Sequence, residues 1–371
     1  MLYLPETALD NKKEINHKLK VSIIIPIRNE EKNILNLVKN LKSISYPFLE
    51  VIIVNDNSDD NSISLLEKYV NDNFSIIELP NNLYGKKAAI KYGLHNCSGD
   101  WIVLTDADTN FSDSWFNCII KYFEKNDIIL APVLIDVNKL SMLNIFEYIE
   151  MLAMQGVSYA STKAGFPFIA SGANMAIKKD IAIELYEKID MSIISGDDVF
   201  ILHEYLKSGK NKVVFVSDKD AIVYTRPNNN LKSFLKQRIR WISKVKYYKQ
   251  PTALFFSFFI YFGHFIPFIL LILAICCLVI SKKLLLIIFL LKFLLDFLFM
   301  VSLKNKLNFP IKYIFYFPFV WIIYFVYISI LALFLVLDKN LFLNILIIAV
   351  DLNERTLKTF LVVPITTLTV L

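Results

Sequence analysis

The stretch VSIIIPIRNEEKNILNLVKNL, residues 21–41, decides the fold of the N-terminal part of this chain. Its first six residues, Val21–Pro26, form a continuous apolar run that ends in proline, as expected of a buried strand. Asn29–Glu31 then opens an amphipathic helix, because a capping asparagine and acids precede apolar residues at helical spacing. These apolar residues share one face of the helix and comprise Ile34, Leu37, Val38 and Leu41. A buried strand followed directly by such a helix predicts the first unit of an α/β domain.

The same pattern recurs downstream. Apolar runs at Glu50–Val54, Phe74–Leu79 and Trp101–Thr105 predict further strands, and Gly85–Asn96 predicts a helix. Strands that are apolar throughout are typical of a parallel sheet whose two faces are both covered. In such a sheet, ligands bind beyond the carboxyl ends of the strands. The loops that follow the strands are therefore where a site is expected.

The composition of the chain changes along its length. The 371 residues are 55% hydrophobic and 20% charged, but residues 251–371 hold only 9 of the 40 Lys and Arg and 4 of the 34 Asp and Glu. This excludes a wholly soluble enzyme, a disordered chain and a small disulfide scaffold. The net charge of +6 lies mostly in that apolar part, so no nucleic-acid partner is expected. The four cysteines have no metal-ligand spacing and are interpreted as reduced packing residues.

Three apolar runs predict helices that cross a membrane. They are Thr252–Ile280, Leu284–Leu303 and Tyr313–Leu337, and each reaches the roughly 20 residues needed to span the hydrocarbon core. Lys292 and Asp296 lie four residues apart in the second run, on one helical face. They are either a polar site in the membrane or a self-neutralised pair, and the second reading is favoured.

The flanking charges predict the orientation of these helices. With the N-terminal part in the cytosol, the cytosolic flanks carry nine Lys and Arg and the opposite flanks carry three, in agreement with the positive-inside rule. The N-terminus lacks the apolar core of a signal peptide, which favours the same orientation.

Polar loops follow three of the predicted strands, and two of them are strongly acidic. The loops are Arg28–Glu31, Asp56–Asp60 and Asp106–Asp108. Asp106 and Asp108 offer hard oxygen ligands, which suit Mg²⁺ or Mn²⁺ beside a substrate phosphate. The alternative is that Asp-Ala-Asp merely caps the next helix, a common use of Asp in turns.

An ordered set of motifs over residues 20–250 resembles the family 2 glycosyltransferases. The set comprises Val21–Pro26, Asn29–Glu31, Val51–Ser58, Gly85–Ala89, Thr105–Asp108, Ser171–Asn174, Ser195–Asp198 and Gln237–Trp241. The last motif, Gln-x-x-Arg-Trp, is similar to that of membrane-anchored members such as the cellulose, chitin and hyaluronan synthases. The resemblance implies an α/β fold class: a GT-A (Rossmann-like) nucleotide-sugar-binding domain followed by C-terminal transmembrane helices.

This reading divides the chain into five segments. They are an N-terminal extension (1–20), the GT-A catalytic domain (21–230), an amphipathic interfacial helix with the Gln-x-x-Arg-Trp motif (231–250), about three transmembrane helices (251–340) and an apolar tail, re-entrant or interfacial (341–371). In the interfacial helix, an apolar face is surrounded by basic residues, which predicts a position at the membrane surface. That face comprises Leu231, Phe234, Leu235, Ile242 and Val245.

The resemblance also implies residue roles on the donor side. They fall to Pro26, Arg28 and Glu30 around the nucleoside, Asp56 at the base or ribose, Lys86 at the phosphates, Asp106 at the ribose or sugar, and Asn174 at the donor sugar or the acceptor. Asp108, with Asp106, would bind Mg²⁺ or Mn²⁺. Plainer alternatives are that Asp56 caps a helix and that Lys86 is a solvated lysine whose role Lys87 takes.

Asp198 is the candidate general base, because a sugar hydroxyl must lose its proton as it attacks the anomeric carbon. Asp197 is the rival, and either acid could instead cap the helix that follows. The family usually has Glu-Asp here, so the Asp-Asp of this chain shortens the first acid. The resemblance further implies that Gln237, Arg240 and Trp241 line the acceptor mouth, with Arg240 otherwise a lipid-facing cation. Both readings stay open for Arg238.

The predicted function is an inverting, metal-dependent glycosyltransferase. It would move a sugar from a nucleotide-diphosphate donor, a UDP- or GDP-sugar, to a lipid or lipid-linked acceptor at the cytosolic membrane face, as cell-envelope synthesis requires. A processive polysaccharide synthase is the alternative, but such enzymes usually have more than three spans. A sugar nucleotidyltransferase would need a glycine-rich loop, and residues 21–31 contain no glycine. The intact acidic set disfavours a non-catalytic membrane scaffold.

Overall fold

The chain forms two compact units, seen in a computed structural model that describes residues 19–137, 139–193, 195–275, 281–304, 306–307 and 309–337. The first unit comprises the chain up to Asp136 together with Val157–Arg226. The second comprises Val137–Gly156 and the chain from Pro227 on. Sequence analysis predicted one continuous catalytic segment, 21–230, whereas Val137–Gly156 groups with the second unit. The predicted tail, 341–371, and most of the N-terminal extension lie outside the described residues.

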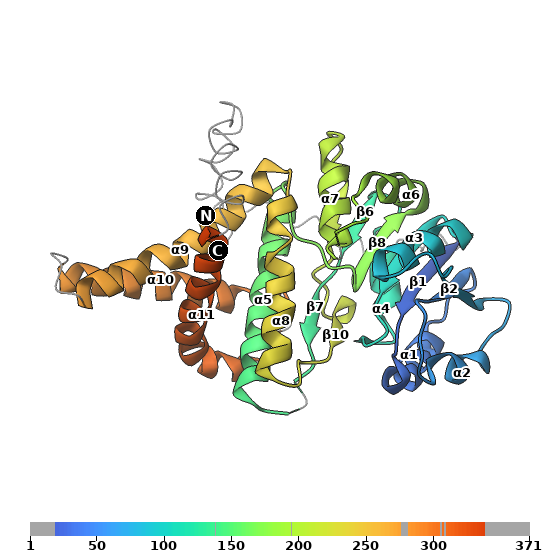
Figure 1. Ribbon diagram of the computed structural model, residues 1–371, viewed down its shortest axis with the longest axis horizontal. Coiled ribbons are helices and arrows are strands. Elements are labelled where there is room, and N and C mark those ends of the chain that lie inside the picture. Colours follow the sequence, from blue (N-terminus) through green and yellow to red (C-terminus); the bar gives the residue numbers. More distant parts are fainter. Residues whose placement is uncertain are drawn as a thin grey trace. The chain divides into compact units, whose positions relative to one another are not determined.

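A seven-stranded sheet is the centre of the first unit (Figure 1). Its strands, in spatial order, are β3 (Phe74–Glu78), β2 (Leu49–Asn55), β1 (Val21–Ile27), β4 (Trp101–Thr105), β8 (Asn174–Lys178), β6 (Ile128–Leu130) and β9 (Val213–Phe215). The first four are parallel, as the apolar runs predicted. β8 runs antiparallel to both β4 and β6, a reversal that the sequence did not predict.

A small second sheet has the spatial strand order β5, β10, β7. Its strands are β5 (Asn110–Phe111), β10 (Val223–Thr225) and β7 (Val133–Ile135). β10 pairs parallel to β7 and antiparallel to β5. This pairing brings Thr225 to the loop that precedes β5, although the two lie more than 100 residues apart in the chain.

Helices connect the strands of the first unit. They are α1 (Glu31–Ser43), α2 (Ser62–Glu67), α3 (Lys86–Asn96), α4 (Trp115–Ile120), α6 (Lys179–Lys188), α7 (Asp197–Lys207) and the short η1 (Lys219–Ala221). The predicted apolar face of α1 is buried, because Ile34 and Leu37 are fully covered and Val38 and Leu41 nearly so. These side chains pack with the isoleucines and valines of β1 and β2 in one apolar cluster. The burial of such a cluster is the main favourable term in folding an α/β domain.

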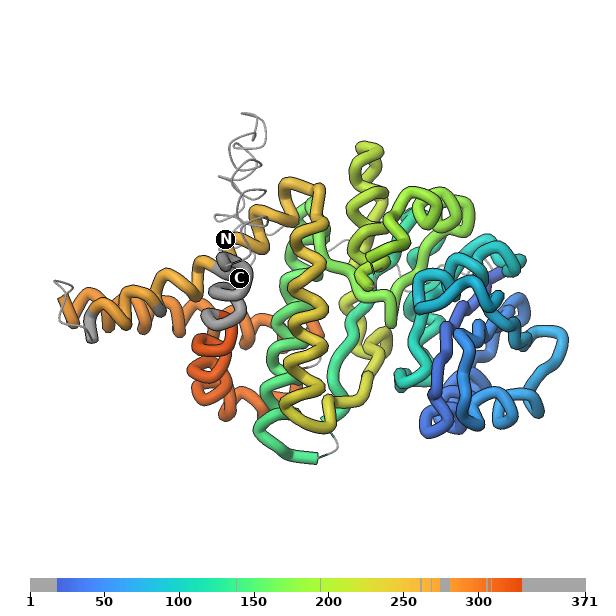
Figure 2. The backbone as a smooth tube through the Cα atoms, viewed as in Figure 1, coloured from blue at the N-terminus to red at the C-terminus, as the bar shows by residue number. Residues whose placement is uncertain are grey.

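Long helices make up most of the second unit (Figure 2). They are α5 (Met142–Lys163), whose last residues belong to the first unit, α8 (Leu231–Ile242), η2 (Val245–Tyr247), α9 (Pro251–Ile275), α10 (Lys282–Ser302), η3 (Ile311–Tyr316) and α11 (Phe317–Leu337). Among the residues that the structure describes, three stretches are long and apolar enough to cross a membrane: Pro251–Leu273, Lys282–Ser302 and Ile311–Ile328. The three predicted apolar runs therefore form helices of spanning length.

The two charged residues in α10 pair with each other. Lys292 Nζ donates to the Asp296 carboxylate one helical turn away, and Trp321 Nε1 of α11 donates to the same carboxylate at 2.8 Å. The pairing fits the predicted self-neutralised pair. The indole bond adds a link from α10 to α11 that the sequence did not indicate.

Candidate active site

Asp106 and Asp108 follow β4 at its carboxyl end, in a turn closed by the bond from Thr109 Oγ1 to the Asp106 carbonyl (2.6 Å). Thr225 Oγ1 of β10 donates to Asp108 Oδ2 at 2.9 Å and fixes that carboxylate. Burial and the neighbouring Asp106 raise the pKa of Asp108 above its ordinary value. The helix-capping alternative does not fit, because the next helix, α4, has Ser114 at its N-cap position.

Glu30 belongs to the same acidic group. Its backbone N–H donates to Ser62 Oγ at 2.8 Å, which ties the loop after β1 to the start of α2. Burial raises the pKa of Glu30, and the charges of Asp108 and Asp106 raise it further. Carboxylates from two strand ends thus lie close enough to repel one another. Such a concentration of hard oxygen ligands suits a divalent cation.

Lys86 is the cation that faces these acids. It is the first residue of α3, after Gly85, whose φ of 88° lies in the left-handed region that glycine tolerates. Lys86 Nζ forms an ion pair with Asp106, and its side chain is 38% exposed. Burial lowers the pKa of Lys86, but Asp106 and Asp197 outweigh it, so the pKa is raised overall. Lys87 is buried and donates to the Asp190 carbonyl at 3.1 Å, so Lys86 is the one placed at the acidic loops.

Asp56 holds the start of α3. Both of its carboxylate oxygens accept from the Gly85 N–H, at 2.9 and 3.0 Å. Asp56 is buried, and Arg28, whose side chain is 59% exposed, lies 3.7 Å from its Oδ2. Asp56 does not cap α2, whose N-cap position is Asn61. Pro26 lies half-buried near the end of β1, on the strand that leads to Arg28.

Asp197 and Asp198 have different surroundings in the first turn of α7. Asp197 is buried and accepts from Tyr186 Oη at 3.0 Å, and burial together with the charge of Asp198 raises its pKa. Asp198 is half-buried, and its Oδ2 accepts from the Gly172 N–H at 3.0 Å. The helix N-cap position is Gly196, so neither acid occupies it.

Gly172 is a close neighbour of both Asp198 and Lys86. A Cβ at this position would lie 3.8 Å from Lys86 Nζ and 3.9 Å from Asp198 Oδ2. The carboxylate and the ammonium therefore lie on the same side of this backbone segment. Sequence analysis assigned no role to Gly172, Tyr186 or Thr225. The glycine lies inside the quoted Ser171–Asn174 motif, whereas no spacing pointed to the other two.

Asn174 does not have the surroundings of a ligand-binding residue. It is 1% exposed at the start of β8. Its Nδ2 donates to the Pro132 carbonyl at 2.8 Å and to the Ala221 carbonyl at 2.9 Å. Its Oδ1 accepts from Trp115 Nε1 at 3.0 Å. The predicted contact with donor sugar or acceptor stays a prediction, and in this structure the buried amide is occupied by partners within the domain.

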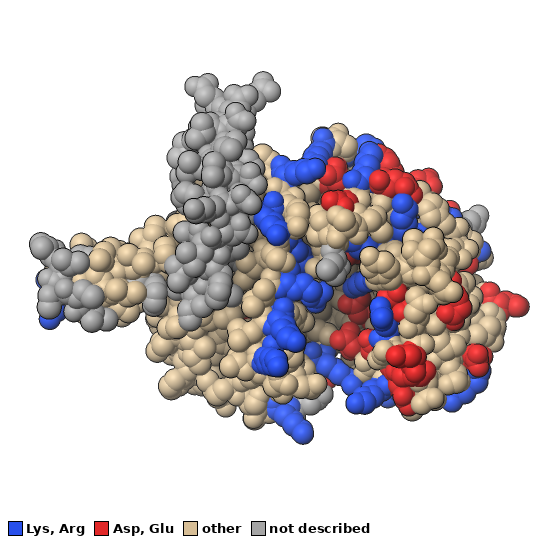
Figure 3. Space-filling model, viewed as in Figure 1, with Lys and Arg blue, Asp and Glu red and all other residues tan. Residues whose placement is uncertain are grey.

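The Gln237–Trp241 motif lies on α8 in the second unit. Gln237 and Trp241 are half-buried and Arg240 is exposed. Of the predicted apolar face, Phe234 is buried, whereas Leu231 is 59% exposed. Figure 3 shows Lys and Arg side chains along this helix. Its exposed cations are Lys232, Lys236 and Arg240.

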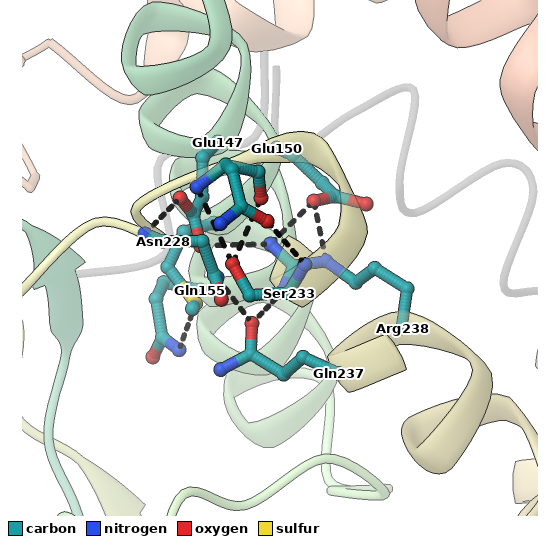
Figure 4. A network of polar contacts seen from close by, with 9 residues as sticks. Glu147, Glu150, Gln155, Asn228, Ser233, Gln237 and Arg238 are labelled. Atoms are coloured by element: carbon teal, nitrogen blue, oxygen red, sulfur yellow. Dashed lines mark hydrogen bonds and ion pairs between the residues drawn. The ribbon is translucent and has the colours of Figure 1, made fainter. Parts of the chain in front are cut away.

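The buried cation of α8 is Arg238. It forms a polar network with Glu147 and Glu150 of α5, with Asn228 and with Gln237 (Figure 4). Sequence analysis left its role open. The helical spacing did contain a signal, because Arg238 lies four residues after Phe234, on the buried face of the helix.

Comparison with known proteins relates residues 22–185 to a known family. They match the family model described as "Glycosyl transferase family 2", so this part of the chain is similar to the domains of family 2 glycosyltransferases. The predicted fold class is confirmed: a GT-A-like α/β domain followed by three apolar helices of spanning length. The predicted enzyme class, glycosyltransferase, is confirmed at the level of this domain.

Individual relatives share part of the chain. The poly-beta-1,6-N-acetyl-D-glucosamine synthase of Staphylococcus aureus (strain COL) is 28% identical to this chain over 242 residues. The aligned part covers 63% of this chain and 57% of the synthase. The undecaprenyl-phosphate 4-deoxy-4-formamido-L-arabinose transferase of Proteus mirabilis (strain HI4320) is 38% identical over 95 residues, 24% of this chain and 29% of its own. The chain thus spans little more than half the length of the synthase.

Among solved structures, the chain is similar to the mannosyltransferase PcManGT from Pyrobaculum calidifontis, determined with GDP-Man and Mn²⁺. The TM-score is 0.48 and the sequence identity 18%, over 64% of this chain and 65% of that one. A second similar structure is S. aureus TarS 1–349 with UDP-GlcNAc, with a TM-score of 0.42 and 20% identity over 57% of this chain and 60% of that chain.

Proposed function

We propose that this chain is an inverting, metal-dependent glycosyltransferase that moves a sugar from a nucleotide-diphosphate donor to a lipid or lipid-linked acceptor at the cytosolic face of a membrane. The observation that carries the proposal is the arrangement of Lys86, Asp106 and Asp198. An ammonium group and two acidic groups lie at the carboxyl ends of the sheet in a family 2 glycosyltransferase domain. In open α/β sheets this edge is where ligands bind.

Asp198 is the proposed general base. Its carboxylate is half-buried and held by a backbone N–H, so it is oriented while retaining access to solvent. In the reaction, the acceptor hydroxyl oxygen forms a bond to the anomeric carbon as the bond from that carbon to the diphosphate oxygen breaks. The hydroxyl proton passes to Asp198, and attack from the face opposite the diphosphate inverts the configuration. Asp197 is the weaker candidate because it is buried and bonded to Tyr186.

Donor binding is assigned to the loops at the strand ends. Asp56 fixes the Gly85 N–H and with it the start of α3, so that Lys86 is positioned to meet the donor phosphates. Arg28, Glu30 and Pro26 would surround the nucleoside, as the family resemblance implies. The UDP and GDP forms remain equal candidates for the donor.

Asp106 and Asp108 are the residues proposed to hold Mg²⁺ or Mn²⁺. Their carboxylates fit such an ion, because their oxygens are hard ligands, Glu30 adds a third carboxylate nearby, and Lys86 forms an ion pair with Asp106. When bound, the ion would neutralise charge that develops on the diphosphate leaving group. Thr225 orients Asp108 for this role by its hydrogen bond to Oδ2.

The acceptor has two candidates, each favoured by one relative. A lipid-linked acceptor fits the likeness to the undecaprenyl-phosphate transferase. A growing polysaccharide fits the likeness to the poly-N-acetylglucosamine synthase, which covers more of this chain. We retain the lipid or lipid-linked acceptor because the three candidate spans among the described residues provide few helices to enclose a polymer channel, and a processive synthase is the second proposal.

The test is a panel of UDP- and GDP-sugars offered to the purified full chain in lipid nanodiscs, with release of nucleoside diphosphate as readout. One or more donors should be turned over with Mg²⁺ or Mn²⁺ and not with EDTA. Asp108→Ala should abolish this turnover, whereas Asp113→Asn, a change at an exposed acid of the same unit, should not. Turnover that is unaffected by EDTA and by Asp108→Ala would overturn the metal assignment.

A second measurement separates the two acceptors. Membrane extract is supplied with the active donor in labelled form, and the product is sized after extraction into organic solvent. A product carrying one added sugar supports a lipid or lipid-linked acceptor. A ladder of long polymers would overturn that choice in favour of the processive synthase.

A further inference from the structure

Arg238 is the most enclosed cation of α8. Its side chain is 3% exposed, and its Nε and Nη2 atoms lie 2.7 and 2.6 Å from Glu150 Oε2. Its Nη2 also lies 3.7 Å from Glu147 Oε1, and both acids belong to α5. The Nε hydrogen bond and the two ion pairs of Nη2 hold the guanidinium against α5. Arg238 is thus locked to α5 rather than directed to solvent or lipid.

The same guanidinium contacts the aromatic residues one turn before and one turn after it. Its central carbon lies 4.4 Å from the ring centre of Phe234 and 4.3 Å from the ring centre of Trp241. Phe234 is buried, and its ring packs against the guanidinium. Trp241 is half-buried. The orientation of the Trp241 indole therefore depends on Arg238, because a planar cation on a ring face is an attractive contact.

Gln237 is held in the same way. Its Oε1 accepts from Arg238 Nη1 and, at 3.0 Å, from Asn228 Nδ2. Asn228 is fixed in turn by Glu147, whose Oε2 accepts from the Asn228 N–H at 2.9 Å. With its oxygen occupied twice, the Gln237 amide has one orientation, in which the NH₂ group faces away from these donors. Figure 4 shows these side chains converging from α5 and α8.

We propose that Arg238 is a positioning residue for sugar transfer: clamped by Glu147 and Glu150, it sets the orientation of Gln237 and Trp241. The proposal rests on the proposed function, in which those two residues contact the acceptor side of the reaction. It gives the motif a member at a position that Gln-x-x-Arg-Trp leaves unspecified. It also predicts that Arg238 acts through its neighbours and not through contact with the substrate.

The test compares Arg238→Lys with wild type in the full chain in nanodiscs. Lysine keeps the charge but has no planar group to stack on the rings and no second nitrogen to reach Gln237 and Glu150 together. We expect the kcat of sugar transfer to fall by about 10²-fold, as a misplacement of about 1 Å does, while the KM for the donor stays within about twofold. Lys232→Gln, at an exposed cation on the same helix, serves as the control and should leave both constants unchanged.

A spectroscopic readout follows the indole directly. The near-ultraviolet circular dichroism of Trp241 is obtained as the difference between a protein and its Trp241→Phe derivative, in the wild-type and the Arg238→Lys background. We expect the difference signal to shrink in the Arg238→Lys background. An undiminished signal together with an undiminished kcat would overturn the proposal.

A triple variant covers the case in which Arg238→Lys fails to fold. Arg238→Met with Glu150→Met and Glu147→Gln removes all three buried charges, and such replacement of a buried ion-pair group by neutral residues is often tolerated. This variant should unfold near the wild-type temperature yet lose transfer to the same extent. Wild-type transfer by the folded triple variant would contradict the positioning role. If the wild type turned over no donor, that result would instead count against the proposed function.

Discussion

Replacing Asn174 by alanine should destabilise the first unit rather than weaken the binding of a sugar. The amide is 1% exposed and joins Trp115, Pro132 and Ala221 by three hydrogen bonds of 2.8 to 3.0 Å. The Pro132 carbonyl also accepts from the Val223 N–H at 3.0 Å and so keeps one partner. The Trp115 N–H and the Ala221 carbonyl, in contrast, lose the hydrogen bond that the Asn174 amide provided. An unsatisfied buried group costs about 1–3 kcal/mol, so we expect a loss of about 3 kcal/mol in the free energy of unfolding.

The assay is thermal unfolding of the full chain in detergent, followed by tryptophan fluorescence. A loss of about 3 kcal/mol lowers the Tm of a domain of this size by about 6–12 °C. Asn126→Ala is the matched control, because Asn126 is half-buried and makes one bond, from its Nδ2 to the Tyr122 carbonyl at 2.8 Å. It should cost about 1 kcal/mol or less. If Asn174→Ala unfolds at the temperature of the control and raises the donor KM about tenfold, the structural assignment is wrong.

Three further changes test separate parts of the structure. Lys86→Met should lower donor turnover about 10²-fold, because it removes the cation proposed to meet the phosphates, whereas Lys91→Met on the same helix should leave it unchanged. His203 is buried, and burial lowers its pKa to about 4, so below pH 6.5 only the unfolded chain takes up its proton. Stability should therefore fall by about 1.4 kcal/mol per pH unit from about pH 6.5 to about pH 4, a slope that His203→Gln should remove. Asp296→Leu should destabilise the helices in detergent by about 3 kcal/mol, because it leaves Lys292 without its carboxylate, and Lys292→Leu in addition should restore most of the loss.

Each of these changes has an outcome that counts against its reasoning. If the Lys86 and Lys91 variants turned over the donor equally well, the assignment of Lys86 to the donor site would be wrong. An unchanged pH slope after His203→Gln, measured by urea unfolding between pH 7 and pH 5, would show that other groups set it. A double variant of α10 no more stable than the single one would mean that Lys292 does not depend on its partner.

Most of the sheet could be predicted because its strands are local sequence features. Val21–Pro26, Glu50–Val54 and Trp101–Thr105 are apolar runs of strand length, and each lies within or matches an observed parallel strand. β8 was not predicted from the sequence. Its direction is set by its pairing with β4 and β6, which are its neighbours in space. A reversal of this kind has no local signal, since an antiparallel strand buried on both faces has the same apolar pattern.

The candidate site was predictable where it lies in loops directly after strands. Asp106 and Asp108 were found in this way, because parallel strands end at one edge of a sheet. Thr225, which holds Asp108, lies 117 residues away from it, and its position is set by the pairing of β10 with β7. Asn174 was assigned to ligand binding from motif resemblance, yet its surroundings come from three separate segments that no motif describes.

Arg238 and Arg240 show how helix geometry separates neighbouring residues. Because each residue of a helix is rotated by about 100° from the one before it, two residues that are two positions apart point to nearly opposite sides. Arg238 falls on the face of Phe234 and Trp241 and is buried, whereas Arg240 is exposed. The side of each residue was therefore available from the sequence. The partners of Arg238 were not, because Glu147 and Glu150 lie about 90 residues earlier in the chain.

The most direct test of the central claim is the turnover of wild type and Asp198→Asn with the donor that the panel identifies. Asparagine keeps the shape of the side chain but cannot accept the acceptor proton. The proposed mechanism predicts a kcat lower by about 10²- to 10⁴-fold in Asp198→Asn, with donor affinity measured by calorimetry unchanged. Wild-type turnover by Asp198→Asn would contradict the assignment of this carboxylate as the base of a glycosyltransferase reaction.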